Sequence, residues 1–267
     1  MKYILALLLL VTQTAYAQKG AYVLYDYDLD RSQIAYNVDE IRSIASITKL
    51  FTAIVVLRSG VELDEKVKVQ GKSGGRFQKG MMITRNNLMR AMLISSDNLA
   101  SETLAHTYPG GFDTFIADAN EYARGMGLIN TTIVDSSGLL AGNVSTAADL
   151  ITFLWKIRDN EVIRKFAKER NDSVSVPKGK KTITVNLRNT NPSIFIFDNI
   201  LISKTGFTNA AGRCVIMLVE KNKSLHGIVI LGQKNIQDRS QIAKDLITAK
   251  VMEKEQMPEP IVFYFPI

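Results

Sequence analysis

The chain has 267 residues, enough for one large domain or two small ones, with 46% apolar and 22% charged residues. This composition excludes wholesale disorder, collagen-like repeats and a multispan membrane protein. The single cysteine excludes an intramolecular disulfide and a four-cysteine metal cluster, and the two histidines argue against a histidine-ligated zinc site. We therefore expect no metal, and if the chain catalyses hydrolysis, we expect a base other than histidine.

Lysine and arginine exceed aspartate and glutamate by seven. A positive net charge suits an anionic polymer, such as a cell wall, a membrane surface or nucleic acid. No basic run is interleaved with aromatic residues, so no nucleic-acid partner is expected.

The first 17 residues have the pattern of a secretory signal peptide. Lys2 is followed by an apolar run from Ile4 to Val11 and by the cleavage signal Ala15-Tyr16-Ala17. The run is too short to span a bilayer comfortably, and no later apolar stretch reaches about 20 residues. We expect cleavage after Ala17, export to the periplasm and no integral membrane segment in the mature protein.

The mature chain begins with strand patterns, continues with helical patterns and returns to strands before a last helix. In chain order, the expected elements are strands 21–27 and 32–36, helix 44–57, strand 66–69, loop 71–75, helices 88–94, 99–105 and 113–126, a helix capped by Ser145, strands 214–219 and 227–232, and helix 238–253. This order predicts an α+β fold whose antiparallel sheet is built from both chain ends. We assign residues 18–256 to one domain and 257–267 to a C-terminal tail.

The first candidate for chemistry is the segment Ser46-Ile47-Thr48-Lys49. Positions i and i+3 of a helix share a face, so the serine hydroxyl and lysine amine make a nucleophile–base pair without histidine. A second copy of this spacing, Ser175 to Lys178, contains Pro177 and does not fit a regular helix.

Two further triplets gain their meaning from their order in the chain. Ser96-Asp97-Asn98 separates two helical patterns, and by itself it fits a helix cap better than a catalytic segment. Lys204-Thr205-Gly206 precedes a strand pattern and is expected on an edge strand. A similar triplet, Lys72-Ser73-Gly74, precedes the S-x-N segment, so it does not fit an order in which K-T-G comes last. The ordered set S-x-x-K, S-x-N and K-T-G is the signature of active-site-serine penicillin-binding proteins and β-lactamases.

The chain resembles the D-alanyl-D-alanine carboxypeptidases and endopeptidases, which are low-molecular-mass penicillin-binding proteins, and it is most similar to the endopeptidases. The matching segments are 42–50, 108–112, 143–147, 188–191 and 204–212. The resemblance implies an antiparallel sheet of about five strands flanked by helices, beside an all-helical lobe, with the active site between them. No segment resembles the stalk domain and amphipathic anchor of the membrane-bound carboxypeptidases, so no anchor is expected.

The resemblance also implies roles for individual residues. Ser46 is the expected nucleophile, and Lys49 is the expected base, with a pKa lowered by burial and by Lys204. Ser96 and Asn98 are expected to relay protons and hold the substrate amide. The expected substrate-binding residues are Lys204, Thr205, Gly206, Phe207 and Thr208, and the backbone N–H groups of Ser46 and Phe207 are expected to form the oxyanion hole.

The implied substrate is a D-alanyl peptide bond in the stem peptides and cross-bridges of peptidoglycan. β-Lactams are the implied covalent inhibitors, and no cofactor is needed. The endopeptidase is favoured over three alternatives. These are a D-alanyl-D-alanine carboxypeptidase, a class A-like β-lactamase and a non-catalytic penicillin-sensing or wall-binding module. A β-lactamase needs a deacylating glutamate, and neither Glu161 nor Glu169 has the spacing expected for one.

Overall fold

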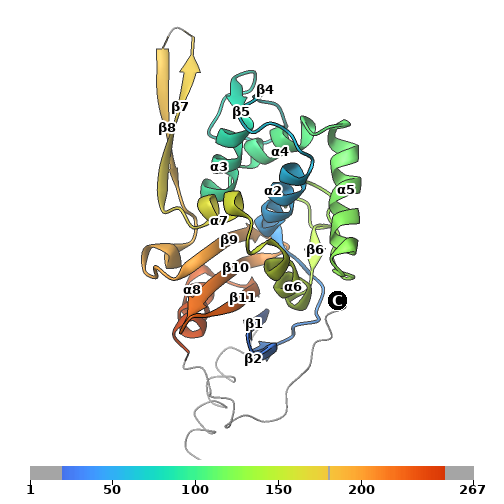
Figure 1. The fold of residues 1–267 in the computed structure, drawn as a ribbon, viewed down its shortest axis with the longest axis vertical. Coiled ribbons are helices and arrows are strands. Elements are labelled where there is room, and N and C mark those ends of the chain that lie inside the picture. The colour runs from blue at the N-terminus through green and yellow to red at the C-terminus, as the bar shows by residue number, and fades with distance from the viewer. Residues whose placement is uncertain (1–19, 180, 250–267) are drawn as a thin grey trace, which may run out of the picture.

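The computed structural model describes residues 20–179 and 181–249. The predicted signal peptide and the tail 257–267 lie outside the described residues. The structure has two parts (Figure 1), a five-stranded sheet and a lobe made mainly of helices. This confirms the α+β class that the sequence predicts.

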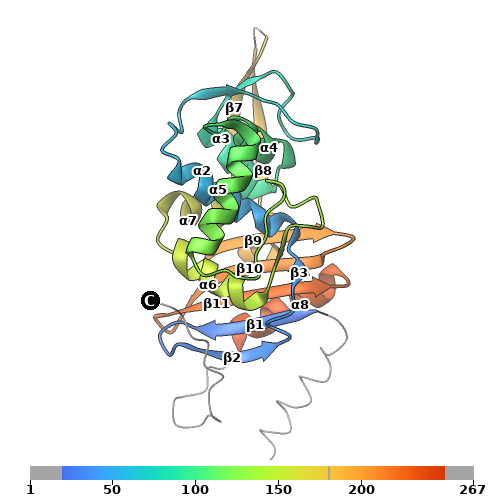
Figure 2. The same ribbon diagram turned by 90° about the vertical axis from the view of Figure 1, so that its right-hand side faces the viewer.

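The sheet combines strands from both ends of the described chain. Its strands are β1 (Ala21–Asp26), β2 (Arg31–Tyr36), β9 (Ile200–Thr208), β10 (Gly212–Lys221) and β11 (Ser224–Gln233). All neighbours pair antiparallel in the order β2-β1-β11-β10-β9. Figure 2 shows β9 as the strand nearest the helical lobe, so the edge strand with Lys204-Thr205-Gly206 lies at the junction of the two parts.

Helices cover both faces of the sheet, which explains the long apolar runs of its central strands. Successive side chains of a strand point to opposite faces. In β10, Val215 and Met217 pack with α8 (Ile236–Thr248), whereas Cys214 and Ile216 join the core shared with the helical lobe. The lone cysteine is therefore buried in the core.

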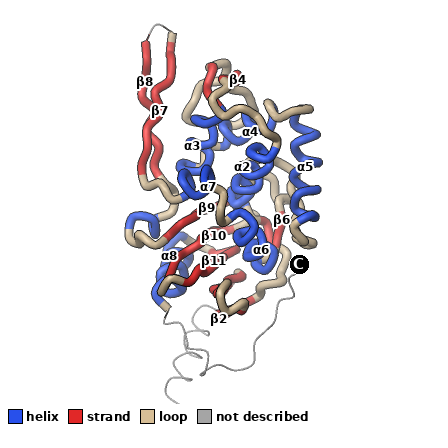
Figure 3. Tube along the Cα trace, in the orientation of Figure 1, coloured by secondary structure: helices blue, strands red, loops and turns tan. Residues whose placement is uncertain are grey.

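Most of the helical lobe lies above β9, and α6 (Ala147–Ile157) packs against the face of the sheet beside β11 and β1 (Figure 3). Its helices are the 3₁₀ turn η1 (Ala45–Ile47), α2 (Thr48–Arg58), α3 (Arg85–Ser95), α4 (Asn98–His106), α5 (Gly111–Gly125), α6 (Ala147–Ile157) and α7 (Glu161–Ala167). Three small strand pairs accompany them: β3 (Arg42–Ser43) with β6 (Val144–Ser145), β4 (Lys66–Lys68) with β5 (Met82–Thr84), and β7 (Asn171–Lys178) with β8 (Lys181–Arg188). A second 3₁₀ turn, η2, spans Pro192–Phe195.

Three expectations need correction in detail. The expected helix 44–57 consists of η1 followed by α2, and it begins at Ala45, whose backbone is left-handed with φ of 46°. Thr146, and not Ser145, caps α6, since the Thr146 side chain accepts from Asp149 N while Ser145 pairs in β6. The elements α7, β7 and β8, and the shorter β3, β5, β6 and η2, were not predicted. No helix within the described residues is long and apolar enough to cross a membrane.

Candidate active site

Ser46 and Lys49 lie where η1 passes into α2. The Lys49 Nζ atom donates to Ser46 Oγ at 2.8 Å, as the spacing of three residues predicts. Lys49 is completely buried, whereas Ser46 is half-buried. The hydroxyl of Ser46 is thus accessible, and the amine beside it is shielded from water.

Close backbone packing holds Ser46 in this position. The left-handed φ of Ala45 is unusual for a residue with a side chain, and such strain occurs frequently at functional sites. A Cβ atom at Gly138 would lie 1.9 Å from the Ala45 carbonyl oxygen, and one at Gly206 would lie 2.9 Å from Ser46 N. Glycine is required at both positions so that the 135–143 loop and β9 can approach the backbone of Ala45 and Ser46.

Lys49 is held by two acceptors in addition to Ser46. Its Nζ atom donates to Asn98 Oδ1 at 2.8 Å and to the Ser137 carbonyl oxygen at 2.6 Å. Burial lowers the pKa of Lys49 from 10.5 to about 7, because the charged ammonium form is desolvated; the carboxylates of Asp135, Asp97 and Glu102 oppose this shift. A substantial fraction of the amine is therefore neutral near pH 7.

Ser96 and Lys204 form a second pair, from the other two motifs. Ser96 ends α3 in a left-handed conformation with φ of 59°, and Lys204 Nζ donates to its hydroxyl at 2.9 Å. Lys204 is buried and also donates to the Thr205 carbonyl oxygen. Burial, and then the charges of Lys49 and Arg239, lower the pKa of Lys204 well below its ordinary value. The structure thus brings the three motifs to one place.

The remaining residues of the K-T-G strand differ in exposure. The Thr205 hydroxyl is 2.6 Å from that of Thr190. Phe207 is 46% exposed, and the Arg213 guanidinium lies over its ring, 3.6 Å from the centroid. Thr208 Oγ1 accepts from Ala211 N, so its side chain is engaged in the β9–β10 turn. Phe207 is therefore the side chain of this strand that is best placed to meet a ligand.

Two residues of one loop, Asp135 and Ser137, were not predicted from the sequence. The Asp135 side chain binds the backbone of this loop, and Ser137 contributes its carbonyl oxygen to the site. The Asp135 carboxylate accepts from the backbone N–H groups of Ser137, Gly138 and Leu140 and from Asn143 Nδ2. The Ser137 carbonyl thereby stays within hydrogen-bond distance of Lys49 and of Ser46 Oγ. An aspartate followed closely by glycine is a turn signal, and it was the only indication of this loop in the sequence.

We predict that Asp135→Asn moves the acid limb of penicillin acylation to lower pH. The Asp135 carboxylate stabilises the charged form of Lys49, so removing its charge lowers the pKa of Lys49 further. The measurement is the acylation rate between pH 5 and 9. Asp113→Asn, an exposed position on α5, is the control and should leave the midpoint unchanged. An unchanged or higher midpoint in Asp135→Asn contradicts this electrostatic role.

Within the described residues, no group of three or more His, Cys, Asp or Glu side chains is placed to hold a metal ion. Arg239 is buried, and it lies near enough to Lys204 to lower the pKa of that amine.

The fold is that of the penicillin-binding proteins. Over 85% of this chain and 94% of the other, the structure superposes on the crystal structure of the Streptomyces K15 DD-transpeptidase with a TM-score of 0.78 and 23% sequence identity. The fold and the three motifs together define the class of active-site-serine penicillin-recognising proteins.

Sequence comparison gives the family. The model of the peptidase S11 family, described as D-alanyl-D-alanine carboxypeptidase, matches residues 11–235. The chain is 36% identical to a D-alanyl-D-alanine endopeptidase of Escherichia coli strain K12 over 239 residues, which cover 84% of this chain and 76% of that protein. It is 35% identical to one of Pseudomonas aeruginosa over 220 residues, or 79% and 70% of the two chains. The chain belongs to the peptidase S11 family of serine-type D-alanyl-D-alanine peptidases.

Proposed function

We propose that the protein is a D,D-endopeptidase that hydrolyses D-alanyl bonds in peptidoglycan cross-bridges through an acyl-enzyme on Ser46. The observation that carries the acyl-transfer chemistry is the buried Lys49 amine, 2.8 Å from Ser46 Oγ and with a pKa of about 7. The endopeptidase activity is favoured over the carboxypeptidase activity because both relatives above are named endopeptidases. The family description itself keeps the carboxypeptidase as the second candidate.

In the proposed acylation step, Lys49 takes the proton of Ser46 as Oγ attacks the carbonyl carbon of the D-alanine that donates its acyl group. The backbone N–H groups of Ser46 and Phe207 stabilise the oxyanion. Collapse of the tetrahedral intermediate breaks the C–N bond, and the leaving amine receives a proton through Ser96, which Lys204 contacts. Asn98 holds the substrate amide, and Thr205 and Lys204 orient a substrate carboxylate.

Deacylation reverses the roles of the same groups. A water molecule gives its proton to neutral Lys49 as it attacks the ester carbon, and the Ser46 oxygen regains a proton when the C–O bond breaks. With a β-lactam, the leaving amine remains tethered to the acyl group, so the adduct persists. Glu161 and Glu169, the two glutamates weighed for a β-lactamase, are both exposed, and neither side chain hydrogen-bonds to the catalytic groups in the described part of the chain.

The endopeptidase proposal predicts that purified dimeric muropeptides are cleaved to monomers faster than free pentapeptide loses its terminal D-alanine. The two reactions break the same kind of bond and share all the proposed catalytic residues, so the difference lies in accommodating the second strand. Mass spectrometry of both digests, with Ser46→Ala protein as the blank, provides the measurement. If pentapeptide is trimmed readily while dimers persist, the protein is a carboxypeptidase. Rapid penicillin turnover indicates a β-lactamase.

We also propose that residues 1–17 are a cleaved signal peptide, that residues 18–256 form the peptidase domain and that the mature protein lies in the periplasm. The support is the apolar run and the A-x-A signal. After cell fractionation, the mature protein is expected with the periplasmic contents and with a mass that lacks residues 1–17. If the protein stays in the membrane fraction after a high-salt wash, this localisation is contradicted.

A further inference from the structure

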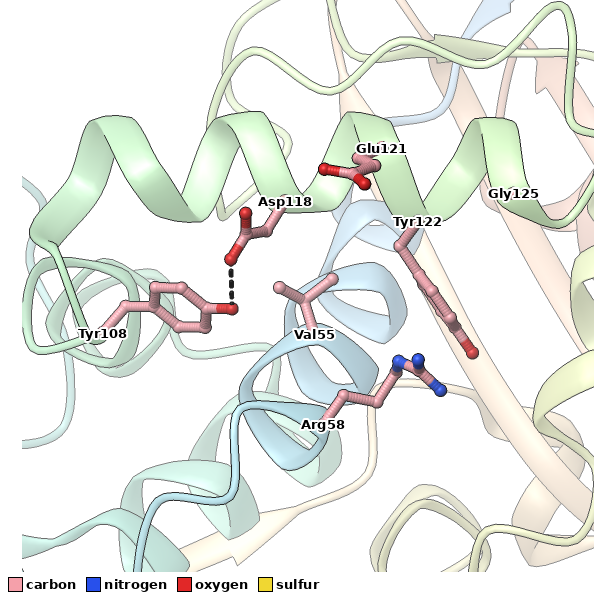
Figure 4. Close-up of a pocket in the computed structure, with 7 residues that line it drawn as sticks. All are labelled: Val55, Arg58, Tyr108, Asp118, Glu121, Tyr122 and Gly125. Atoms are coloured by element: carbon pink, nitrogen blue, oxygen red, sulfur yellow. Dashed lines mark hydrogen bonds between the residues drawn. The ribbon is translucent and has the colours of Figure 1, made fainter.

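A hollow of about 440 Å³ lies between the second half of α2 and α5 (Figure 4). The residues that line it are Val55, Arg58, Tyr108, Asp118, Glu121, Tyr122 and Gly125. Its volume falls in the range of small-molecule sites, roughly 300–1,000 Å³. Arg58 follows Lys49 by nine residues on α2, about 14 Å at 1.5 Å per residue, so the hollow is separate from the Ser46 site.

Side chains of opposite charge line this hollow without pairing with one another. Arg58 has no ion pair within the described residues, and its guanidinium lies over the Tyr122 ring, 4.5 Å from the centroid. Asp118 accepts from the Tyr108 hydroxyl at 2.6 Å, and exposed Glu121 has no hydrogen bond or ion pair in the same described part. Figure 4 shows Val55 between the guanidinium and the Asp118 carboxylate.

We propose that this hollow binds the α-amino-acid head group of a ligand, which carries an ammonium and a carboxylate on one carbon. The carboxylate would accept from the Arg58 guanidinium, whose planar donors match it, and the ammonium would donate to Asp118 and Glu121. Tyr108 fixes the orientation of Asp118, and Tyr122 holds Arg58 by a cation–π contact. A ligand with only one of the two charges leaves half of these groups unpaired.

Two sources supply this chemistry. One is the free end of a diamino acid in a peptidoglycan stem outside the catalytic site, and this source rests on the proposed function. The other is a free amino acid such as released D-alanine. Both present the same head group, but a stem also carries flanking residues that fill more of the hollow.

The test is calorimetric titration of the Ser46→Ala protein, so that binding does not depend on turnover and is measurable even if the proposed function is wrong. The probes are 2,6-diaminopimelate, D-alanine, 1,5-diaminopentane and pimelate. The two amino acids are expected to bind at least about tenfold more tightly than the diamine or the dicarboxylate, because both charge-assisted contacts are needed. Tighter binding of an uncross-linked muropeptide with a free diamino acid end than of D-alanine assigns the wall as the source, provided that Arg58→Gln removes the gain, since binding in the Ser46 cleft does not involve Arg58. Equal binding assigns free amino acids.

Variants locate the site. Arg58→Gln is expected to weaken amino-acid binding at least about tenfold and to leave the diamine unchanged, whereas Glu121→Gln weakens both. Arg124→Gln, which removes the same charge from α5 outside the hollow, is the matched control. Thermal unfolding checks each fold, and Glu121→Gln alone decides the matter if Arg58→Gln fails to fold. Absence of saturable binding, equal affinity for pimelate, or an equal loss in Arg124→Gln overturns the proposal.

Discussion

Ser46→Ala is expected to abolish the covalent penicillin adduct while leaving the protein folded. The alanine lacks the only atom that the proposed mechanism bonds to the acyl group, so acylation should fall by at least about a thousandfold. The lost contacts are a hydrogen bond from Lys49 and a long one, of 3.3 Å, to the Ser137 carbonyl. Because Ser46 is half-buried and Lys49 keeps two other acceptors, the free energy of unfolding should change by no more than about 1 kcal/mol.

The measurement is intact mass after incubation with benzylpenicillin, together with a thermal unfolding curve. The matched control is Ser175→Ala, which alters the second S-x-x-K copy of the chain. Ser175 lies on strand β7 and is exposed, so this variant should acquire the full adduct. A penicillin adduct on Ser46→Ala, or its loss from Ser175→Ala, contradicts the assignment of Ser46 as the nucleophile.

The sequence predicted the parts of the fold that have strong periodic signals. The apolar runs around Cys214 and Ile228 fill strands buried on both faces, and the motifs that mark the site consist of side chains with fixed spacing. Lys49 at three residues from Ser46 is the clearest case, since the helical repeat alone brings the two together.

The features that were missed have weak or purely main-chain signals. The β7–β8 pair alternates buried Val174 and Val176 with exposed serines. Pro177 argued only against a helix in this segment, and in the structure it lies near the end of a two-stranded pair, where proline is tolerated. Ser137 contributes a carbonyl oxygen, which every residue has, so its side-chain identity carried no information about the contact with Lys49.

The pH dependence of acylation should follow the titration of Lys49. With an ordinary lysine pKa, only about 0.03% of the amine is neutral at pH 7, whereas the pKa of about 7 leaves about half of it able to accept the Ser46 proton. Because we propose neutral Lys49 as the base, we expect the acylation rate to rise with pH through about 7 and reach a plateau above it. At pH 5 about 1% of the amine is neutral, so the rate should be about a hundredfold below the plateau.

The Lys49→Arg variant tests whether Lys49 acts as a base or contributes only a positive charge. A guanidinium remains protonated throughout pH 5–9 and cannot accept the Ser46 proton, so we expect acylation to fall by about a thousandfold or more and to lose the rise centred near pH 7. Stopped-flow rates with a chromogenic cephalosporin across this range provide the measurement. Lys72→Arg, in the exposed triplet that resembles K-T-G, is the matched control and should retain the full profile. Near-normal acylation by Lys49→Arg, or a flat profile in the unmodified protein, removes Lys49 from its role as base.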